Sequence, residues 1–216
     1  MNFTPKIQTK IYGLKKNLNE IINLFNADKF PNKILLSGPK GIGKSTMAYH
    51  FINYVFSKNE TYSYNLQLNE INVSNKSFKL IEKGSHPNFY LIDLDNDKKN
   101  IEISQIRKMI EYTNKSSFNN LPKLILIDNV ENLNKNSINS LLKLIEEPNH
   151  NVFFILVHNS NHKLLATLKS RCLLFKISLT FDESIKITNK LLNDNIFNLL
   201  HKDLISHYNT PGNYIK

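Results

Sequence analysis

The sequence reads ILLSGPKGIGKST at residues 34–46, where a short apolar run leads into a glycine-rich turn. The apolar run, at 34–36, is closed by serine and glycine, and its length and flanks favour a buried strand. Apolar and aromatic residues then dominate positions 47–56, which predicts a helix. Residues 38–45 match the pattern G-x-x-x-x-G-K-[ST] in the strand-to-helix context that the pattern requires.

The glycine-rich turn has the chemistry of a phosphate-binding loop, or P-loop. Its glycines let the backbone turn so that N–H groups face phosphate oxygens. Lys44 supplies a positive charge to the β and γ phosphates, and Ser45 offers a hydroxyl to Mg²⁺. A glycine-rich turn without a ligand is the alternative. The residues that we expect to contact a nucleotide are Gly38, Pro39, Lys40, Gly41, Ile42, Gly43, Lys44, Ser45 and Thr46.

Outward from this loop, short apolar runs alternate with amphipathic helical patterns. Strands and helices that alternate in this way indicate a parallel sheet flanked by helices, so we predict an α/β fold. Besides the strand and helix around the loop, the predicted strands lie at 89–92, 124–127, 152–157 and 173–177, and the predicted helices at 14–25, 103–112 and 137–145.

Two segments depart from this alternation, one after its last strand and one within it. Two helical patterns, at 181–192 and 196–207, follow the last predicted strand. We therefore expect residues 1–178 to form a nucleotide-binding core and residues 179–216 to form a partial helical lid. Residues 58–86 are polar, rich in Asn, Ser and Lys, and weakly periodic, which indicates an insertion of undefined structure.

A P-loop needs a further carboxylate at the tip of a nearby strand to hold the metal through its water shell. Asp128 ends the apolar run 124–127 and is the candidate, although an aspartate there could also be a strand terminator or helix cap. A hydrolysing site usually has a second carboxylate beside it, but here the next residue is Asn129, which cannot accept a proton from water. Glu131 could substitute, although it lies two residues further on, beyond the expected end of the strand. We expect nucleotide binding without efficient hydrolysis.

Composition sets the class of protein. The chain has 28 Lys and Arg against 18 Asp and Glu, a net charge of +10, which suits a partner that carries phosphates. A coding bias toward Lys, Asn and Ile would produce the same charge. The single cysteine, Cys172, excludes an internal disulfide and a zinc site with several thiolates. Neither a spanning apolar run nor a signal peptide is visible, so we expect a cytoplasmic protein with no membrane partner.

Three strings downstream of the loop resemble a known family. They are NSLLKLIEEP at 139–148, the apolar strand at 153–157 and Ser-Arg-Cys at 170–172. Together they resemble the AAA+ modules of bacterial DNA polymerase III clamp loaders. The residues Ile-Tyr-Gly at 11–13, Gly-Ser-His-Pro at 84–87 and the helix at 103–110 are more similar to the delta-prime subunit than to the hydrolysing gamma or tau subunit.

The resemblance covers residues 7–213 and implies roles for two further residues. Arg171, in the Ser-Arg-Cys string, matches the arginine finger that such subunits present in trans to the ATP site of a neighbour. Its alternative is an ordinary surface ion pair. Asn159 matches a sensor position that contacts the γ-phosphate or the attacking water, although a slip of one residue would exchange it with His158.

The resemblance also implies ATP or ADP with Mg²⁺ as ligand. The implied partners are gamma or tau and delta subunits, the sliding clamp and primer-template DNA. Three features depart from the family pattern. Residues 58–86 contain no cysteine, so we expect no zinc. Asn213 stands where hydrolysing relatives place a sensor arginine, and the chain stops at Lys216, where the family continues into a helical collar domain.

Two other functions remain open from the sequence. The chain could be an autonomous hydrolysing P-loop enzyme, such as a gamma/tau-like AAA+ ATPase or a small-molecule kinase. A kinase would need an arginine-rich lid, and only Arg107 and Arg171 follow the loop. The chain could also be an interaction module whose P-loop no longer binds nucleotide.

Overall fold

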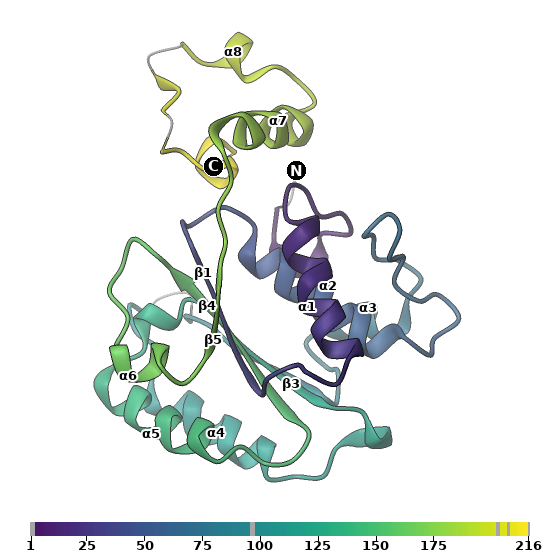
Figure 1. Ribbon diagram of the computed structural model, residues 1–216, viewed down its shortest axis with the longest axis vertical. Helices are drawn as coiled ribbons and strands as arrows, with labels where there is room; N and C mark the ends of the chain where they lie inside the picture. Colours follow the sequence, from purple (N-terminus) through teal and green to yellow (C-terminus); the bar gives the residue numbers. More distant parts are fainter. Residues whose placement is uncertain (1–2, 96–97, 202–203, 207, 216) are drawn as a thin grey trace.

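In a computed structural model, which describes residues 3–95, 98–201, 204–206 and 208–215, the centre of the chain is a five-stranded parallel sheet (Figure 1). The strand order is β2-β3-β4-β1-β5, and each neighbouring pair is parallel. Parallel strands with helices between them confirm the predicted α/β fold. The strands are β1 Lys33–Gly38, β2 Phe89–Ile92, β3 Lys123–Ile127, β4 Val152–Asn159 and β5 Leu173–Lys176.

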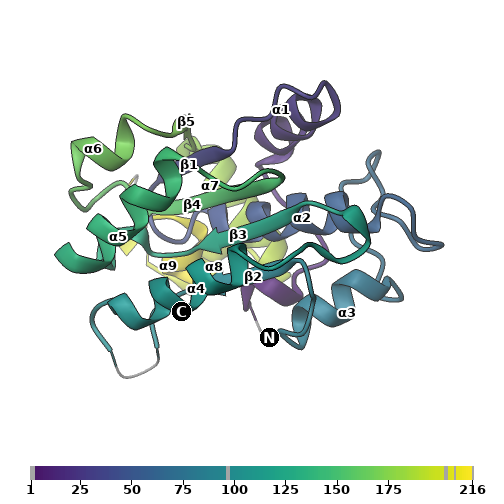
Figure 2. The ribbon, with the colours of Figure 1, turned by 90° about the horizontal axis from the view of Figure 1, so that it is seen from below.

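Helices cover both faces of the sheet, as Figures 1 and 2 show. Consecutive strand residues point to opposite faces, so Leu36 packs in the core beneath α1 and α2, and Leu35 packs in the core beneath α4 and α5. This two-sided burial explains why the central strands β1, β3 and β4 read as continuous apolar runs. The helices are α1 Lys15–Asn26, α2 Lys44–Ser57 and α3 Lys76–Glu82 on one side, and α4 Ile103–Thr113, α5 Lys135–Glu146 and α6 Ala166–Lys169 on the other.

The polar segment 58–86 is partly built into the core. Of its apolar residues, Ile71, Phe78 and Ile81 are buried, whereas Leu66, Leu68 and Val73 remain exposed. The side chain of Asn75 accepts a hydrogen bond from the Phe78 amide and thereby begins α3. Short 3₁₀ helices complete the core at η1 Pro5–Ile7, η2 Phe118–Asn120 and η3 Val130–Asn132.

The segment that we predicted as a lid contains α7 Phe181–Leu192, α8 Ile196–Leu199 and α9 Pro211–Tyr214, and we keep the name lid for it. Figure 1 shows it at the end of the sheet where β1 runs into the glycine-rich loop. The predicted helix at 196–207 is wrong, because α8 ends at Leu199; positions 202, 203 and 207 of that prediction lie outside the described residues. Only Ile196 of α8 is buried, so little packing is available to extend a short helix.

The parallel arrangement positions the candidate site. The carboxyl ends of β1, β2, β3 and β4 meet at one edge of the sheet, and Gly38, Asp93, Asp128 and Asn159 lie at or directly after these ends. The same edge faces the lid. Across the described ranges, each helix is too short or too polar to cross a lipid bilayer.

Candidate functional site

The glycine-rich loop connects β1 to α2, and two of its glycines have left-handed backbones. Gly41 has φ +81° and Gly43, the N-cap of α2, has φ +97°, so residues with a Cβ would be strained at both positions. Gly38 is needed for a different reason: a Cβ there would lie 2.2 Å from the backbone oxygen of Ile177. The loop thus delivers the N-terminus of α2, with its unpaired N–H groups, to the edge of the sheet.

Lys44, the first residue of α2, is buried at the base of this loop. Its ammonium group donates to the carbonyl oxygen of Gly38 at 2.8 Å and to that of Pro39 at 2.6 Å. Burial lowers the pKa of Lys44 to about 8, and the carboxylates of Asp128 and Glu131 oppose this shift. The amine therefore keeps its proton at neutral pH, and the loop holds a cation beside its own backbone N–H groups.

Asp128 and Ser45 form the second part of the site. The Asp128 carboxyl group follows β3, and it is hydrogen-bonded to the Ser45 hydroxyl and accepts from the Asn129 amide at 2.9 Å. Burial raises the pKa of Asp128 to about 6, despite these hydrogen bonds and the charge of Lys44. At neutral pH the carboxyl group is therefore mostly ionised and can bind a cation.

Asp93 is a site residue that the sequence analysis missed. It follows β2, and its Oδ1 accepts a hydrogen bond of 2.7 Å from the side-chain amide of Asn129. It is also close enough to Asp128 to raise the pKa of that carboxyl group. The signal was present, because Asp93 ends the apolar run 89–92 just as Asp128 ends the run 124–127.

Asn159 and His158 end β4, and their side chains make different contacts. Asn159 lines the cavity, and its side-chain oxygen accepts from the Asn161 amide at 3.2 Å. The His158 ring instead lies 2.9 Å from the hydroxyl of Ser37 and 3.0 Å from the carbonyl oxygen of His162. Glu131 is engaged elsewhere, because its carboxylate accepts the backbone N–H of Asn159 at 3.0 Å.

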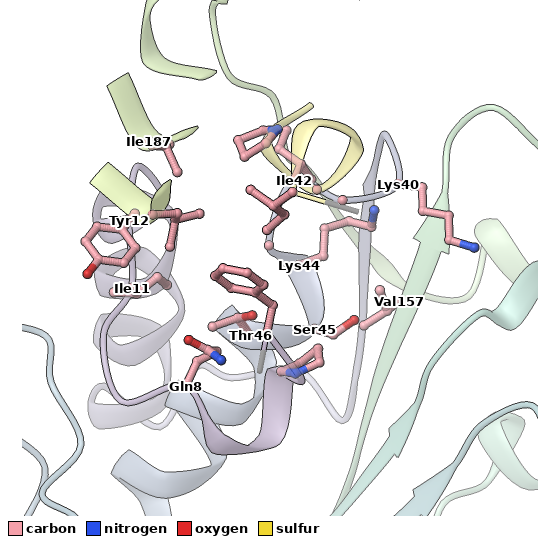
Figure 3. A pocket seen from close by; sticks show the side chains of 18 of the residues that line it. Gln8, Ile11, Tyr12, Lys40, Ile42, Lys44, Ser45, Thr46, Val157 and Ile187 are labelled. Carbon is pink, nitrogen blue, oxygen red and sulfur yellow. The ribbon is translucent and has the colours of Figure 1, made fainter. Parts of the chain in front are cut away.

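These groups surround a cavity of about 470 Å³ between the sheet edge and the lid (Figure 3). Every loop residue from 40 to 46 lines it, whereas Gly38 and Pro39 contribute through the carbonyl groups that hold Lys44. Figure 3 shows Ile11, Tyr12 and Ile187 on the side of the cavity away from Lys40. The cavity therefore has a charged end at the loop and an apolar end beneath the lid.

The lid contacts the loop directly. The Gly212 amide donates to the carbonyl oxygen of Gly41 at 3.0 Å, and the Thr210 hydroxyl donates to that of Lys40 at 2.7 Å. A Cβ on Gly212 would lie 2.5 Å from the Cα of Gly41, so glycine alone fits this approach. Asn213, at the position singled out in the sequence, also lines the cavity.

The residues present fit a magnesium nucleotide. The P-loop N–H groups and Lys44 would hold the phosphates, and the oxygens of Ser45 and Asp128 are the hard ligands that Mg²⁺ prefers. No three His, Cys, Asp or Glu side chains gather as a metal site within the part of the chain that the structure describes. Phosphate oxygens and water would complete the coordination of an ion held by Ser45 and Asp128.

Arg171 lies away from this cavity. It stands two residues before β5, and the first residue of that strand, Leu173, pairs with Ile34 near the beginning of β1. The loop begins at the other end of β1, at Gly38. The guanidinium group forms an ion pair with Glu146, at the end of α5. The structure thus brings together all predicted site residues except Arg171.

Comparison with known proteins identifies the fold. The chain superimposes on a DNA polymerase III gamma subunit-related protein from Thermotoga maritima with a TM-score of 0.53 and 20% identity, which covers 83% of this chain and 51% of that one. It superimposes on the RuvB Holliday junction branch migration motor of the same organism with a TM-score of 0.50 and 18% identity, covering 88% and 56%. These similarities confirm the P-loop AAA+ α/β fold.

Sequence comparison identifies the family. DNA polymerase III subunit gamma of Buchnera aphidicola subsp. Schizaphis graminum is 35% identical over 185 residues, 84% of this chain and 47% of that protein. Subunit delta' of Pseudomonas aeruginosa is 28% identical over 138 residues, 64% and 40%. The chain thus spans about half the length of such relatives or less. The family model described as DNA polymerase III, delta subunit, matches residues 13–180, and the chain therefore belongs to this clamp-loader subunit family.

Proposed function

We propose that this chain acts as a delta-prime-type subunit of a bacterial DNA polymerase III clamp loader in the cytoplasm. It binds ATP or ADP with Mg²⁺ weakly or without efficient hydrolysis. It supplies Arg171 to the ATP site of a neighbouring subunit while a sliding clamp is loaded onto primer-template DNA. Its partners are gamma or tau subunits and delta. The 35% identity to a gamma subunit and 28% identity to a delta' subunit support a place among these subunits.

The geometry of the cavity supports nucleotide binding. Lys44 and the N-terminus of α2 face the position of the phosphates, and Ser45 with Asp128 offers oxygen ligands to Mg²⁺. The apolar end, which includes Ile11, Tyr12 and Ile187, suits a purine base. Bound Mg²⁺ would neutralise charge on the phosphates.

The surroundings of Asn129 support weak hydrolysis. An amide can orient a water molecule but cannot take its proton. The carboxylate of Glu131, the substitute considered from the sequence, is bound to the backbone N–H of Asn159. The side chain at 129 is thus an amide, and the carboxylate at 131 is already hydrogen-bonded. Neither is available to accept a proton from a water molecule near the γ-phosphate.

The observation that carries the proposal is the distance of Arg171 from its own loop. Gly38 lies four residues after Ile34, which pairs with Leu173, and this length of strand spans about 13 Å. Arg171 precedes Leu173 by two residues in the chain, and its guanidinium group forms an ion pair with Glu146. An arginine in this position serves a phosphate of another subunit better than one in its own site.

The test is to mix the chain with a hydrolysing gamma-type subunit and delta, and to measure ATP hydrolysis stimulated by clamp and primer-template DNA. Arg171→Ala should lower the rate by a factor of about 10³ or more, the usual effect of an arginine finger. Lys169→Ala, an exposed lysine on α6, is the matched control. An unchanged rate with Arg171→Ala would remove the proposed role.

One observation favours a second candidate, an autonomous AAA+ ATPase of the gamma or tau type. Asp93 places a carboxylate beside Asn129 in the cavity, where a hydrolysing site has its second acidic group. Steady turnover of ATP by the purified chain, lost in Asp93→Asn with nucleotide binding retained, would favour this candidate. No turnover above a Lys44→Ala background would favour the delta-prime type.

A further inference from the structure

The contact between Arg171 and Glu146 joins two segments that the sequence singled out separately. Glu146 is the last residue of α5, in the string NSLLKLIEEP, and Arg171 lies in Ser-Arg-Cys, 25 residues later. The Glu146 Oε1 atom accepts from Nε of Arg171 at 2.9 Å and lies 2.6 Å from Nη2. The Nη1 atom donates to the carbonyl oxygen of Thr167 at 2.9 Å.

The geometry of the guanidinium group shows which N–H donors of Arg171 remain after this contact forms. Arginine has five N–H donors in one rigid plane and remains charged at any pH that proteins tolerate. Glu146 binds the edge made by Nε and Nη2, and Thr167 takes one donor of Nη1. Two N–H donors, one on Nη1 and one on Nη2, remain for another acceptor. A phosphate group binds such a pair well.

The exposure of the pair argues against a role in holding the fold together. The side chains of Arg171 and Glu146 are 37% and 48% exposed. Ion pairs at such exposure contribute little to stability, because water screens them and two long side chains lose rotamer freedom. Holding a long arginine in one rotamer does, however, matter to a partner that must meet it in one orientation.

We propose that Glu146 is the positioning residue for Arg171. It fixes the inner edge of the guanidinium group, together with the Thr167 carbonyl group, and directs the remaining N–H donors toward a nucleotide phosphate held by a neighbouring subunit. This inference rests on the proposed role of Arg171 in trans. It assigns a function to the first glutamate of the Glu146-Glu147 pair and none to the second.

The experiment uses the full chain assembled with a hydrolysing gamma-type subunit and delta, with ATP, clamp and primer-template DNA. Glu146→Ala should lower the kcat of stimulated hydrolysis about tenfold and change the KM for ATP little, because the arginine acts on the transition state. Glu146→Gln keeps the acceptor oxygen and should recover much of the rate. Glu147→Ala, at the adjacent exposed carboxylate, should match the unmodified chain.

A double variant separates positioning from a structural role. In the Arg171→Ala background, Glu146→Ala should cause no further loss, since it acts only through the arginine. A further loss in that background would overturn the proposal, as would a rate for Glu146→Ala equal to or above that of the unmodified chain. If Arg171→Ala itself has no effect, the proposed function fails first. Thermal unfolding of each variant excludes misfolding, and Glu146→Gln decides the case if Glu146→Ala does not fold.

Discussion

At the scale of single residues, the contacts of Lys44 show how the loop is arranged to bind a ligand. Its ammonium group is bound to the neutral carbonyl oxygens of Gly38 and Pro39. A phosphate oxygen carries a negative charge, so its Coulomb attraction to the ammonium group exceeds that of a neutral carbonyl oxygen. A phosphate can therefore take the ammonium group from these oxygens with a net gain, and the side chain needs only a small movement within a site that is already formed.

The first prediction concerns this lysine. Lys44→Ala should weaken the affinity for ADP by at least about tenfold, or about 1.4 kcal/mol, because it removes the buried cation of the site. Equilibrium titration with a fluorescent ADP analogue measures the change. Lys16→Ala, an exposed lysine of α1 outside the cavity, is the control and should bind as the unmodified chain does. Equal affinities for all three chains would contradict the role of the loop.

Two buried histidines predict acid sensitivity. Burial lowers the pKa of His50 and of His86 to about 4, from an ordinary value of about 6.5. His86 stacks on Phe56 with ring centroids 4.0 Å apart, and its Nδ1 accepts the Asn88 N–H at 3.3 Å, a contact that needs a neutral ring nitrogen. Between pH 6.5 and 4 the unfolded chain binds protons at these positions and the folded chain does not, so stability falls as pH falls.

The second prediction follows from this direction of the change in stability with pH. Each histidine should cost roughly 3 kcal/mol of unfolding free energy as the pH falls from about 6.5 to 4. Asp128 acts in the opposite direction, because its pKa is raised to about 6 and its protonation favours the folded chain. The two histidines outweigh the one aspartate, so chemical denaturation should show a net loss of unfolding free energy as the pH falls. His86→Gln should reduce the slope, and a stability that does not change between pH 6.5 and 4.5 would contradict the argument.

At the scale of elements, the contact between α9 and the loop links the lid to the nucleotide site. The Thr210 and Gly212 donors occupy the carbonyl oxygens of Lys40 and Gly41, so these carbonyl groups face the lid and the N–H groups of the loop remain for a ligand. The loop is thus held in shape from outside the core as well as by its own glycines. Moving the lid would change the loop that binds the phosphates.

The third prediction tests this contact. Gly212→Ala would place a Cβ 2.5 Å from the Cα of Gly41, which forces α9 away from the loop. We expect weaker ADP binding and faster amide hydrogen exchange in residues 208–215, with little change in the sheet. Gly84→Ala is the matched control: its backbone has φ +68°, but a Cβ there meets nothing within 4 Å. It should lower stability by about 1 kcal/mol and leave nucleotide affinity unchanged.

The elements also show how far a sequence alone can lead. Strands such as β3 and β4 were predictable because burial on both faces makes them apolar throughout. The loop was predictable because its glycines and Lys44 have the spacing of a phosphate-binding motif. The contact of Gly212 with Gly41 was not, since it joins residues far apart in the chain through backbone atoms that no side-chain pattern reports. Asp93 was missed for a similar reason: its meaning depends on the pairing of β2 with β3.

At the scale of the whole molecule, the two regions to which we assign a function lie at different ends of the sheet. The nucleotide cavity lies at the carboxyl ends of the strands, under the lid, and the Arg171–Glu146 pair lies near the other end of β5. No residue of this pair lines the cavity. A subunit built in this way can take part in two sites of an assembly at once, one in its own cavity and one in that of a neighbour.

The fourth prediction is that these two regions can be inactivated separately. Effects of distant substitutions that share no partner usually add within about 0.5 kcal/mol. Arg171→Ala should therefore bind ADP as the unmodified chain does, while stimulated hydrolysis by the neighbouring subunit falls. Lys44→Ala should lose its own nucleotide and still support that hydrolysis in the assembled complex. If Lys44→Ala lowers the hydrolysis as much as Arg171→Ala does, nucleotide in this chain controls how it presents the arginine, and the two regions form one coupled unit.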